Sequence, residues 1–484
     1  MTRRRTAMLA AGLLVSGVPV ATTALAATPA CGRAPQPAAL SFAPRVYIDK
    51  VRPGGEPVSV VAQDGSISVS AHGGTTHLYK DPNALAAGAV DFVSTYGNQT
   101  LNWRSTDGGR TWSYIGTAGG RNGPHTLTSS GFSDPDYAID RGGRIYNTEI
   151  NLANVAVFSS GDDGQTYSRG VAEVTSGDRP WLTAGGLDEV YLYVNSFQQI
   201  FRSTDGGITW RLMSQNNSAG PDAKMYIDPL NPDGLIGPHN PQGVAISADH
   251  GKTWTAYDGA KLGKTVDFFG AVAVDKAGNV YRAAAGGYEG SEDTKATGGS
   301  VTFNSFDRRT RAWRTPVRIP APQGDMLWPW VVAGDDGRVA VAWLQRLPKH
   351  PDRFEMYVAA TVNAHGTDVR CKDGRTRHLP PQWTVANASH GPVHVGFICL
   401  SGTACNASRD FAAGDRRLGD FYTVNYDKDG RIFVVGGTTV QPGADVQRPT
   451  SVPIFIGATG GPKLVTTPMR TRRTRPSCGL DPLC

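Results

Sequence analysis

Hydrophobic and polar residues alternate along short stretches of this chain, and turns rich in glycine and aspartate separate the stretches. In VVAGDDGRVAVAW (331–343), for example, an extended run lies on each side of a Gly-Asp-Asp-Gly turn. Stretches of this kind occur seven times, at 60–70, 138–150, 182–194, 226–237, 272–284, 331–343 and 424–436. Alternation with a period of two residues around such a turn is typical of a β-hairpin. The pattern therefore predicts a chain built largely from hairpins.

A second kind of turn alternates with these hairpins. Four segments share an aspartate, a glycine and a closing aromatic residue: RSTDGGRTW (104–112), SSGDDGQTY (159–167), RSTDGGITW (202–210) and ISADHGKTW (246–254). The aspartate can accept hydrogen bonds from backbone N–H groups of its own turn, and glycine adopts the positive φ that tight hairpins require. The aromatic ring is expected to lie over the turn. We interpret these segments as structural devices rather than as a catalytic site.

Alternation of the two turns defines a four-stranded unit, with strands A and B joined by the first turn and C and D by the second. Repetition of such a unit around an axis is a β-propeller. We therefore expect an all-β fold, a single propeller of seven blades, with six blades as the alternative. Three later C–D turns are degenerate, at 305–313, 362–383 and 456–461. The last unit lacks a clear D strand, and residues 42–50 are expected to supply it and close the ring.

The two ends of the chain differ in composition from this repeating body. Three arginines (3–5), an apolar run (7–20) and Ala24-Leu25-Ala26 have the order of a cleaved signal peptide. We expect a signal peptide at 1–26, the propeller domain at 27–465 and a basic, Cys-containing tail at 466–484. The mature protein is expected to be secreted and extracellular, with no stable membrane anchoring, and to be a monomer.

The cysteine count agrees with export. Six cysteines follow the predicted cleavage site, and an even number in an exported protein favours disulfides over metal ligands. Cys399 and Cys405 flank a short turn, so a local bridge is expected there. Cys31 lies near one end of the mature chain and Cys478 and Cys484 near the other, so a bridge between them would link the two ends. The connectivity itself stays open.

The formal charge of +6 is concentrated at the ends. The arginines at 3–5 contribute three positive charges and residues 463–475 contribute five, so the rest of the chain carries −2. A body without net positive charge does not favour nucleic-acid binding. The sequence also lacks H-E-x-x-H, G-x-S-x-G and the phosphate-binding G-x-x-x-x-G-K, and therefore gives no sign of those enzyme classes.

The four complete turns match S-x-D-x-G-x-T-W closely, with Tyr167 in place of the tryptophan in the second. On this motif the chain resembles the Asp-box (BNR-repeat) propellers of the sialidase superfamily over most of residues 42–465. The resemblance implies a carbohydrate-active protein, with exo-sialidase-type activity as one form. Catalytic sialidases open the first A strand with Arg-Ile-Pro, whereas this chain has Gly55-Glu56-Pro57 there. Its own Arg318-Ile319-Pro320 lies before the sixth unit. Tyr288-Glu289 could mimic the nucleophile pair, although neighbours on one strand face opposite ways.

Topology locates the candidate site. Both kinds of turn lie on one face of the propeller, so the D-to-A crossovers and B–C loops gather around the hub on the other face. An acid precedes the innermost strand of every unit: Glu56, Asp136, Asp178, Asp222, Asp267, Asp325 and Asp420. We expect most of these acids to be structural, with two or three converging on a substrate, because glycoside hydrolysis uses a pair of carboxyl groups.

From this ring we select three acids as catalytic candidates, and we add Glu289. The catalytic candidates are Asp178, Asp267, Asp325 and Glu289; the substrate-binding candidates are Arg179, Trp181, Trp328 and Arg417. Arginine forms paired hydrogen bonds to carboxylates or sugar hydroxyls, and tryptophan offers a flat face on which a sugar ring can stack.

The sequence thus predicts a secreted sialidase-like propeller that acts on an extracellular glycan or polysaccharide as a glycoside hydrolase. The alternatives are a non-catalytic glycan- or protein-binding propeller and a polysaccharide lyase. No cofactor and no metal are expected, with a bound Ca²⁺ as the alternative.

Overall fold

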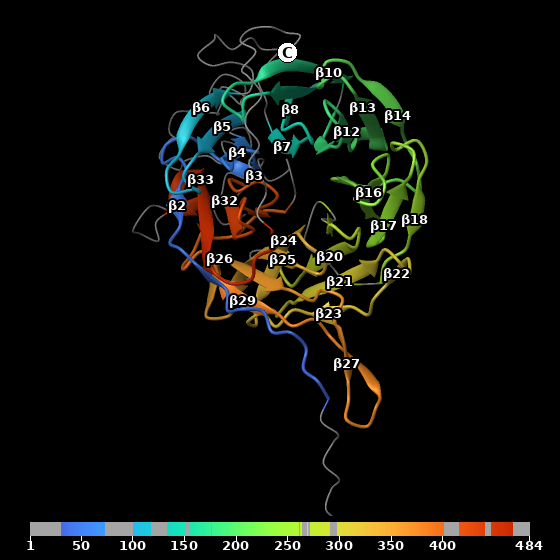
Figure 1. Cartoon of the computed structure of the whole chain (residues 1–484). Helices are drawn as coiled ribbons and strands as arrows, with labels where there is room; N and C mark the ends of the chain where they lie inside the picture. The colour runs from blue at the N-terminus through green and yellow to red at the C-terminus, as the bar shows by residue number, and fades with distance from the viewer. Residues whose placement is uncertain are drawn as a thin grey trace, which may run out of the picture.

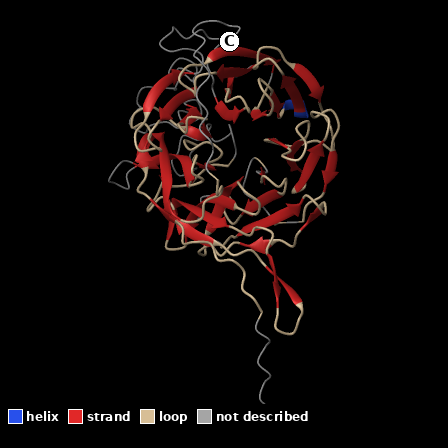
Figure 2. Cartoon of the chain, in the orientation of Figure 1, coloured by secondary structure: helices blue, strands red, loops and turns tan. Residues whose placement is uncertain are grey.

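The computed structural model is a ring of β-sheets arranged around a central axis (Figure 1). It describes residues 31–72, 100–117, 133–151, 154–175, 177–260, 262–263, 269, 272–290, 298–400, 416–440 and 447–467. Strands make up nearly all of the regular structure in these residues, and a single 3-10 turn, η3 (Ser196–Gln198), interrupts them (Figure 2). The all-β prediction is confirmed. None of the helical structure in the described ranges has the length and apolar character needed to cross a bilayer.

Seven antiparallel blades of four strands each form the ring, so the predicted blade count is confirmed. In the first six blades the first strand along the chain is the innermost, whereas in the last blade the strand from the N-terminal segment is the outermost. The first blade consists of β3 (Gly55–Val61), β4 (Ile67–His72), β5 (Thr100–Ser105) and β6 (Ser113–Thr117), and the second of β7 (Ser133–Ile139), β8 (Ile145–Asn151), β9 (Asn154–Ser160) and β10 (Ser168–Thr175). The third consists of β11 (Trp181–Ala184), β12 (Val190–Val194), β13 (Gln199–Ser203) and β14 (Arg211–Ser214). The fourth consists of β15 (Tyr226–Ile227), β16 (Leu235–His239), β17 (Gly243–Ser247) and β18 (Thr255–Tyr257).

The last three blades carry additional strands. The fifth blade consists of β19 (Val272–Val274), β20 (Val280–Ala285), β21 (Val301–Asp307) and β22 (Ala312–Trp313), with β23 (Val317–Arg318) added. The sixth consists of β24 (Asp325–Ala333), β25 (Val339–Leu347), β26 (His350–Thr361) and β29 (Thr384–Asn387), with β30 (His394–Val395) added. The seventh consists of β31 (Thr423–Tyr426), β32 (Ile432–Val440), β33 (Gln447–Gly460) and the N-terminal β1 (Ser41–Phe42), with β2 (Val46–Tyr47) added.

Strands from the N-terminal segment complete the last blade, as predicted. Ser41 of β1 lies opposite Gly460, and Val46 of β2 lies opposite Phe455, so both pair with β33. Residues 456–460 are therefore part of a continuous strand, which corrects the prediction of a degenerate turn at 456–461. No C–D turn is needed there because the outermost strand comes from the other end of the chain.

The Asp-box turns have the predicted hydrogen bonds. In the first, the Asp107 carboxylate accepts bonds from the Thr111 backbone N–H (2.9 Å) and hydroxyl (2.6 Å). The Trp112 indole N–H reaches back to the Gly109 carbonyl at 3.0 Å, so the ring covers the turn. The slight burial of Asp107 favours a higher pKa, yet the hydrogen bonds from Thr111 prevail and hold it at about 2. These aspartates stabilise hairpins, as the sequence analysis expected.

The irregular segment 362–383 forms a separate hairpin of β27 (Thr367–Arg370) and β28 (Thr376–Leu379), which projects outward from the ring (Figure 1). A disulfide joins its Cys371 to Cys31. A bridge from Cys31 to the C-terminal cysteines, which would link the two ends, is therefore not formed. Cys399 is disulfide-bonded. Cys405 lies outside the described residues, so the predicted Cys399–Cys405 bridge stays a prediction, as does the signal peptide.

Apolar side chains fill the spaces between neighbouring blades. Ile67 and Val69 of the first blade pack with Phe433 and Val435 of the last, which seals the ring where its two ends meet. Comparable clusters join blades two and three, four and five, and five and six. Burial of these faces leaves the inner strands to line the axis, where polar groups face a cavity.

Candidate functional site

Four inner strands have a residue followed by proline at or near their start, and these residues share an unusual backbone. Glu56, Asp134, Arg179 and Trp328 precede Pro57, Pro135, Pro180 and Pro329 and have φ values of 48°, 55°, 51° and 54°. Positive φ is uncommon for residues other than glycine, and such conformations concentrate at functional sites. The register shifts at this point in β3, β7 and β24, so the ladder is interrupted where each strand enters the hub.

A pocket of about 320 Å³ lies at this mouth of the hub. It is lined by Asp178, Arg179, Trp181, Asn195, Asp222 and Phe269. Asp178 and Arg179 come from the entry to β11, and Asp222 from the crossover before β15. The pocket therefore lies where the sequence analysis placed the candidate site, beside the third and fourth blades.

Asp178 is the carboxylate most open to this pocket, with 55% of its side chain exposed. Partial burial and the negative charge of Asp134 raise its pKa, although Arg179 works in the opposite direction. Its carboxylate lies 3.6 Å from the Arg179 Nε. Asp178 thus combines access to the pocket with a tendency to keep its proton.

Arg179 connects the pocket to a buried group of charges beneath it. Its guanidinium donates to the Asp420 carboxylate at 3.1 Å and lies 4.3 Å above the centre of the Phe269 ring. Its backbone N–H donates to the Asp134 carboxylate at 3.1 Å. Arg416 also donates two hydrogen bonds to Asp420, one of them 2.6 Å long. Arg179 is therefore held in place by several partners before any ligand arrives.

Glu56 and His72 are the most deeply buried titratable pair of this group. The Glu56 carboxyl is 1% exposed, and His72 Nε2 lies 3.2 Å from its Oε2. Burial, together with the charge of Asp420, raises the pKa of Glu56 to about 7, while Arg416 works against the rise. Burial also lowers the pKa of His72 to about 4. Near neutral pH the imidazole is consequently uncharged, and Glu56 keeps its proton to a higher pH than an exposed carboxyl does.

We call Glu56, His72, Asp134, Asp178, Arg179, Arg416 and Asp420 the hub charge cluster. It holds four carboxyl groups and two guanidinium groups, so carboxyls are in excess. Like charges that cannot all ionise raise each other's pKa values, which matches the upward shifts of Glu56 and Asp178. The pocket above this cluster is consequently acidic.

Asp222 brings a second carboxylate to the pocket wall. It accepts hydrogen bonds from the Gln198 side chain at 3.0 Å and from the Asn240 backbone N–H. Asn195 is anchored beside it, because its backbone N–H donates to the Asp178 carbonyl at 2.9 Å. Both carboxylates of the pocket are therefore positioned by neighbouring loops.

A larger cavity of about 570 Å³ follows the axis between the inner strands. Trp330 lines this channel and Trp181 lines the mouth pocket, and the two rings contact each other with centroids 6.0 Å apart. Phe269 and Phe421 pack against the same rings. This aromatic layer lies between the pocket and the channel.

The structure brings three of the eight predicted site residues to the pocket, namely Asp178, Arg179 and Trp181. Trp181 is only 3% exposed, so most of its ring is used in the aromatic layer and not offered as a stacking platform. Asp267 lies outside the described residues. Glu289 is exposed, whereas its neighbour Tyr288 is buried and donates to the Ile398 carbonyl at 2.6 Å; both lie in the segment after β20 and not in a strand.

The other three predicted residues do not line the pocket. Asp325 is fully buried and pairs with the Arg346 guanidinium at 2.9 Å. Trp328 stacks on Tyr422 and is 2% exposed, and Arg417 is 1% exposed. The predicted roles in substrate contact therefore do not fit these three positions. For Asp325 and Trp328 the physical reason is the interrupted ladder in β24, where the register shifts between Leu327 and Trp330. Arg417 lies in the crossover before β31 and is buried there.

Sequence reasoning missed Asp134 and His72, and it selected Asp136 as the acid of the second blade. Asp136 instead forms a buried ion pair with Lys224, whose ammonium also donates to the Leu182 carbonyl at 3.0 Å. The x-Pro dipeptides at 56–57, 134–135, 179–180 and 328–329 were the available signal, because they mark equivalent positions in four blades.

One group of side chains that does not line the pocket has the composition of a cation site. Asp275, Asp336 and His365 place one potential ligand atom each within 4.8 Å of one another. Asp275 already accepts hydrogen bonds from the Tyr281 hydroxyl and the Gly337 N–H, and His365 contacts the Tyr281 hydroxyl and Ser305. These bonds join blades five and six and account for the cluster without an ion.

Comparison with known proteins identifies one Asp-box repeat in the chain. The BNR/Asp-box repeat model matches residues 201–212, which is the third Asp-box turn. No curated protein matches the chain. Among solved structures, a Dyadobacter fermentans protein of unknown function is 13% identical with a TM-score of 0.44, covering 87% of this chain and 99% of that one. A GH74 xyloglucanase from Xanthomonas campestris is 14% identical with a TM-score of 0.46, covering 84% of this chain and 55% of that one. Likeness at this level says nothing about activity.

Proposed function

Because the chain is a seven-bladed Asp-box propeller with an acidic pocket at the mouth of its hub, we propose that it is an extracellular glycoside hydrolase. The observation that carries this proposal is the pair of carboxyl groups, Asp178 and Asp222, on the wall of one pocket. Glycosidic bonds are hydrolysed by such pairs, in which one carboxyl donates a proton and the other acts as a base or nucleophile.

Asp178 is the proton donor in this scheme. Its raised pKa keeps the proton available, and its exposure to the pocket allows the carboxyl to reach a glycosidic oxygen. Asp222 is the second carboxylate, held by Gln198 and Asn240. Arg179 and Asn195 supply hydrogen-bond donors that orient sugar hydroxyls.

The size of the pocket favours a single terminal sugar unit. At about 320 Å³ it falls at the small end of the range for small-molecule sites. A long polymer would need an open groove with exposed aromatic rings, whereas Trp181 and Trp328 are buried. An exo-acting enzyme is therefore favoured over one that cuts within a chain.

The charge of the pocket favours a neutral or amino sugar over an acidic one. Arg179 is the arginine of the pocket wall, and it already pairs with Asp420. Arg416 and Arg417 are buried at 6% and 1% exposure, so the carboxylate of a sialic acid would meet a single guanidinium. Exo-sialidase activity and lyase action on uronates are for this reason weaker candidates. Binding without cleavage remains the second candidate, because the charged groups are already satisfied by one another.

The test uses the purified secreted protein and a panel of aryl glycosides of neutral, amino, sialic and uronic sugars, read by release of the aryl group. We expect cleavage of a neutral or amino glycoside. Asp178→Asn should lower kcat by about 10²–10⁴-fold, because the proton donor is lost. Asp258→Asn, an exposed aspartate of blade four, is the matched control and should leave kcat unchanged.

Three outcomes would contradict the assignment. Cleavage by Asp178→Asn at the wild-type rate would remove Asp178 from the mechanism. Preferential cleavage of sialosides would show that the excess of carboxyls does not set the specificity. Retention of a sugar without turnover would make the protein a binding module.

A further inference from the structure

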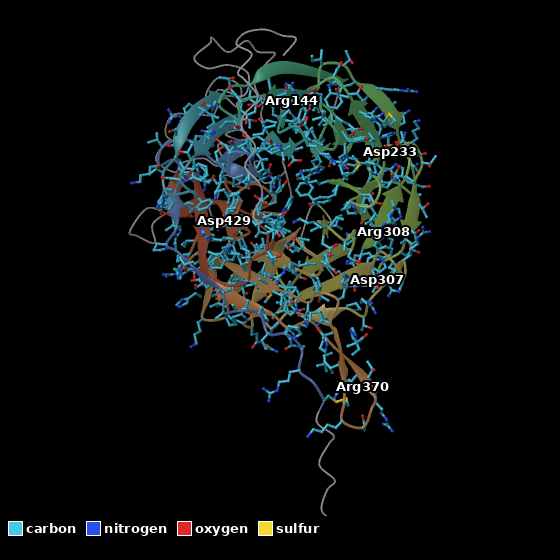
Figure 3. The ribbon with its side chains drawn as sticks, viewed as in Figure 1. Arg144, Asp233, Asp307, Arg308, Arg370 and Asp429 are labelled. Carbon is cyan, nitrogen blue, oxygen red and sulfur yellow. A yellow bond between two sulfur atoms is a disulfide. The ribbon has the colours of Figure 1, made fainter. Side chains whose placement is uncertain are left out.

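The hairpin of β27 and β28 is the segment that departs most from the propeller plan. It replaces the C–D turn of blade six and extends outward from the rim, where Figure 3 shows Arg370. The C–D turns lie on the face opposite the mouth pocket, so this hairpin is separate from the proposed hydrolase site. Nothing in the proposed mechanism uses it.

The hairpin carries more positive than negative charge, and all of its charged residues are exposed. Residues 367–379 contain four Arg or Lys and two Asp. Asp373 lies 3.8 Å from Arg375, and Asp368 lies 2.7 Å from His378. Arg370, Lys372 and Arg377 form no ion pair with any residue that the structure describes. These three cationic side chains are therefore available to bind a partner molecule.

The disulfide holds the N-terminal segment against the hairpin, and that segment contributes a fourth cation, Arg33. The Gly32 backbone N–H donates to the Arg370 carbonyl at 3.3 Å, beside the Cys31–Cys371 bond. Val369 is 7% exposed where Gly32 covers it, which gives the hairpin a small apolar contact. Arg33 follows directly and is exposed. The segment and the hairpin therefore present their cations together.

The arrangement of these cations excludes a flat partner. Arg370 lies opposite Thr376, and Val369 opposite Arg377, so Arg370 and Arg377 point to opposite faces of the two-stranded ribbon. A bilayer surface would meet only one of these faces. The exposed residues 372–378 include no large apolar side chain that could enter a membrane. They also include no Phe, Tyr or Trp on which successive nucleic-acid bases could stack, and the imidazole of His378 is already paired with Asp368.

We propose that the β27–β28 hairpin, with Arg33, is a docking element for a linear polysaccharide that carries carboxylates. A flexible chain can pass around the hairpin and meet cations on both of its faces. Arginine guanidinium groups match carboxylates in charge and geometry. Docking on this rim holds the protein on the polymer and leaves the mouth pocket open on the other face.

The test measures binding of the full-length secreted protein to polygalacturonate, with dextran as the uncharged comparison and anionic phospholipid vesicles as the flat comparison. The variant Arg370→Gln/Lys372→Gln/Arg377→Gln removes three charges. We expect about tenfold weaker binding to polygalacturonate at low salt, because each exposed ion pair contributes modestly. Affinity of the wild-type protein should fall as salt is added, and less steeply in the variant.

A second triple variant, Arg110→Gln/Arg211→Gln/Lys252→Gln, is the matched control, because it removes three exposed charges from other blades. It should bind polygalacturonate as the wild-type protein does. Equal losses in both variants would show that overall charge and not the hairpin is responsible, and would overturn the proposal. So would an unchanged affinity of the hairpin variant, absence of wild-type binding to polygalacturonate, or tighter binding to the vesicles. Unchanged melting temperatures show that both variants remain folded.

Discussion

Glu56 and His72 show how burial sets the charge of single side chains in the hub. Both are nearly inaccessible to solvent, and the pKa of each moves toward the value that favours its neutral form. For Glu56, burial and the neighbouring Asp420 raise the pKa to about 7. The unfolded chain ionises this carboxyl near 4.5. Ionised Glu56 is therefore more costly in the folded protein than in the unfolded one.

This difference predicts a pH-dependent effect of Glu56→Gln. Because the pKa of Glu56 is higher in the folded protein than in the unfolded chain, protonation of Glu56 contributes stability below about pH 4.5. That contribution is lost as the pH rises through about 7. The amide cannot ionise, so the variant should be more stable than the wild-type protein by about 1–3 kcal/mol at about pH 8. At about pH 4.5 the two should have similar free energies of unfolding. Urea titrations at both pH values measure this.

Asp258→Asn provides the control for this comparison, because Asp258 is exposed. It should change the free energy of unfolding little at either pH. If Glu56→Gln were destabilising by the same amount at both pH values, the carboxyl would be ionised throughout and the buried pair would be misassigned.

The Asp-box turn is the repeated element on which each blade's outer hairpin depends. In the fourth blade the Asp249 carboxylate accepts bonds from the Thr253 N–H (2.9 Å), the Thr253 hydroxyl (2.7 Å) and the Ser247 hydroxyl (2.9 Å). Slight burial opposes the shift, but the bonds from Thr253 lower the pKa of Asp249. The carboxylate therefore organises the turn most strongly in its charged form.

Asp249→Ala should destabilise the protein by about 1–2 kcal/mol at neutral pH, because several turn donors lose their acceptor. Because the pKa of Asp249 is lower in the folded protein than in the unfolded chain, its ionised form contributes stability above pH 3.8, and this is lost as the pH falls through the folded pKa. The difference in stability between the variant and the wild-type protein should therefore shrink in acid. Asp258→Ala in the same blade should cost little, since that side chain is exposed. A pH-independent loss would contradict this account. Thermal melts of both variants across pH provide the measurement.

Closure of the ring depends on residues from both ends of the described chain. The N-terminal strands pair with β33, and Cys31 lies ten residues before β1 and is bonded to Cys371 of blade six. The disulfide thus ties the segment that completes the last blade to a neighbouring part of the ring. Its two cysteines are 340 residues apart in sequence. A link across so long a stretch restricts the unfolded chain considerably.

Cys31→Ser/Cys371→Ser should therefore lower the free energy of unfolding by about 2–4 kcal/mol, which is typical for the loss of a native disulfide. Each single substitution should cost about as much as the double one, since either breaks the same bond. Denaturant titrations of the three variants test this. A double variant as stable as the wild-type protein would show that strand pairing alone closes the ring.

Local chemistry accounts for the parts of the fold that were predictable. Alternation and turn composition identified the hairpins, the Asp-box turns and the seven blades, because each depends on residues close together in the chain. The supply of a final strand by the N-terminal segment was also predictable, since the last unit lacked one. In contrast, the Cys31–Cys371 bond joins segments whose proximity depends on how far the blade-six hairpin projects.

The candidate site was predictable in position but only partly in composition. The mouth of the hub and the pair Asp178 and Arg179 follow from the topology and from the residues that open the third blade. Asp325 and Arg417 were selected by the same pattern, yet both are buried. Which acid faces the pocket depends on the positive-φ residue before each proline, on the partner that neighbouring blades offer, and on the resulting pKa. Those relations exist only once the blades are brought together around the axis.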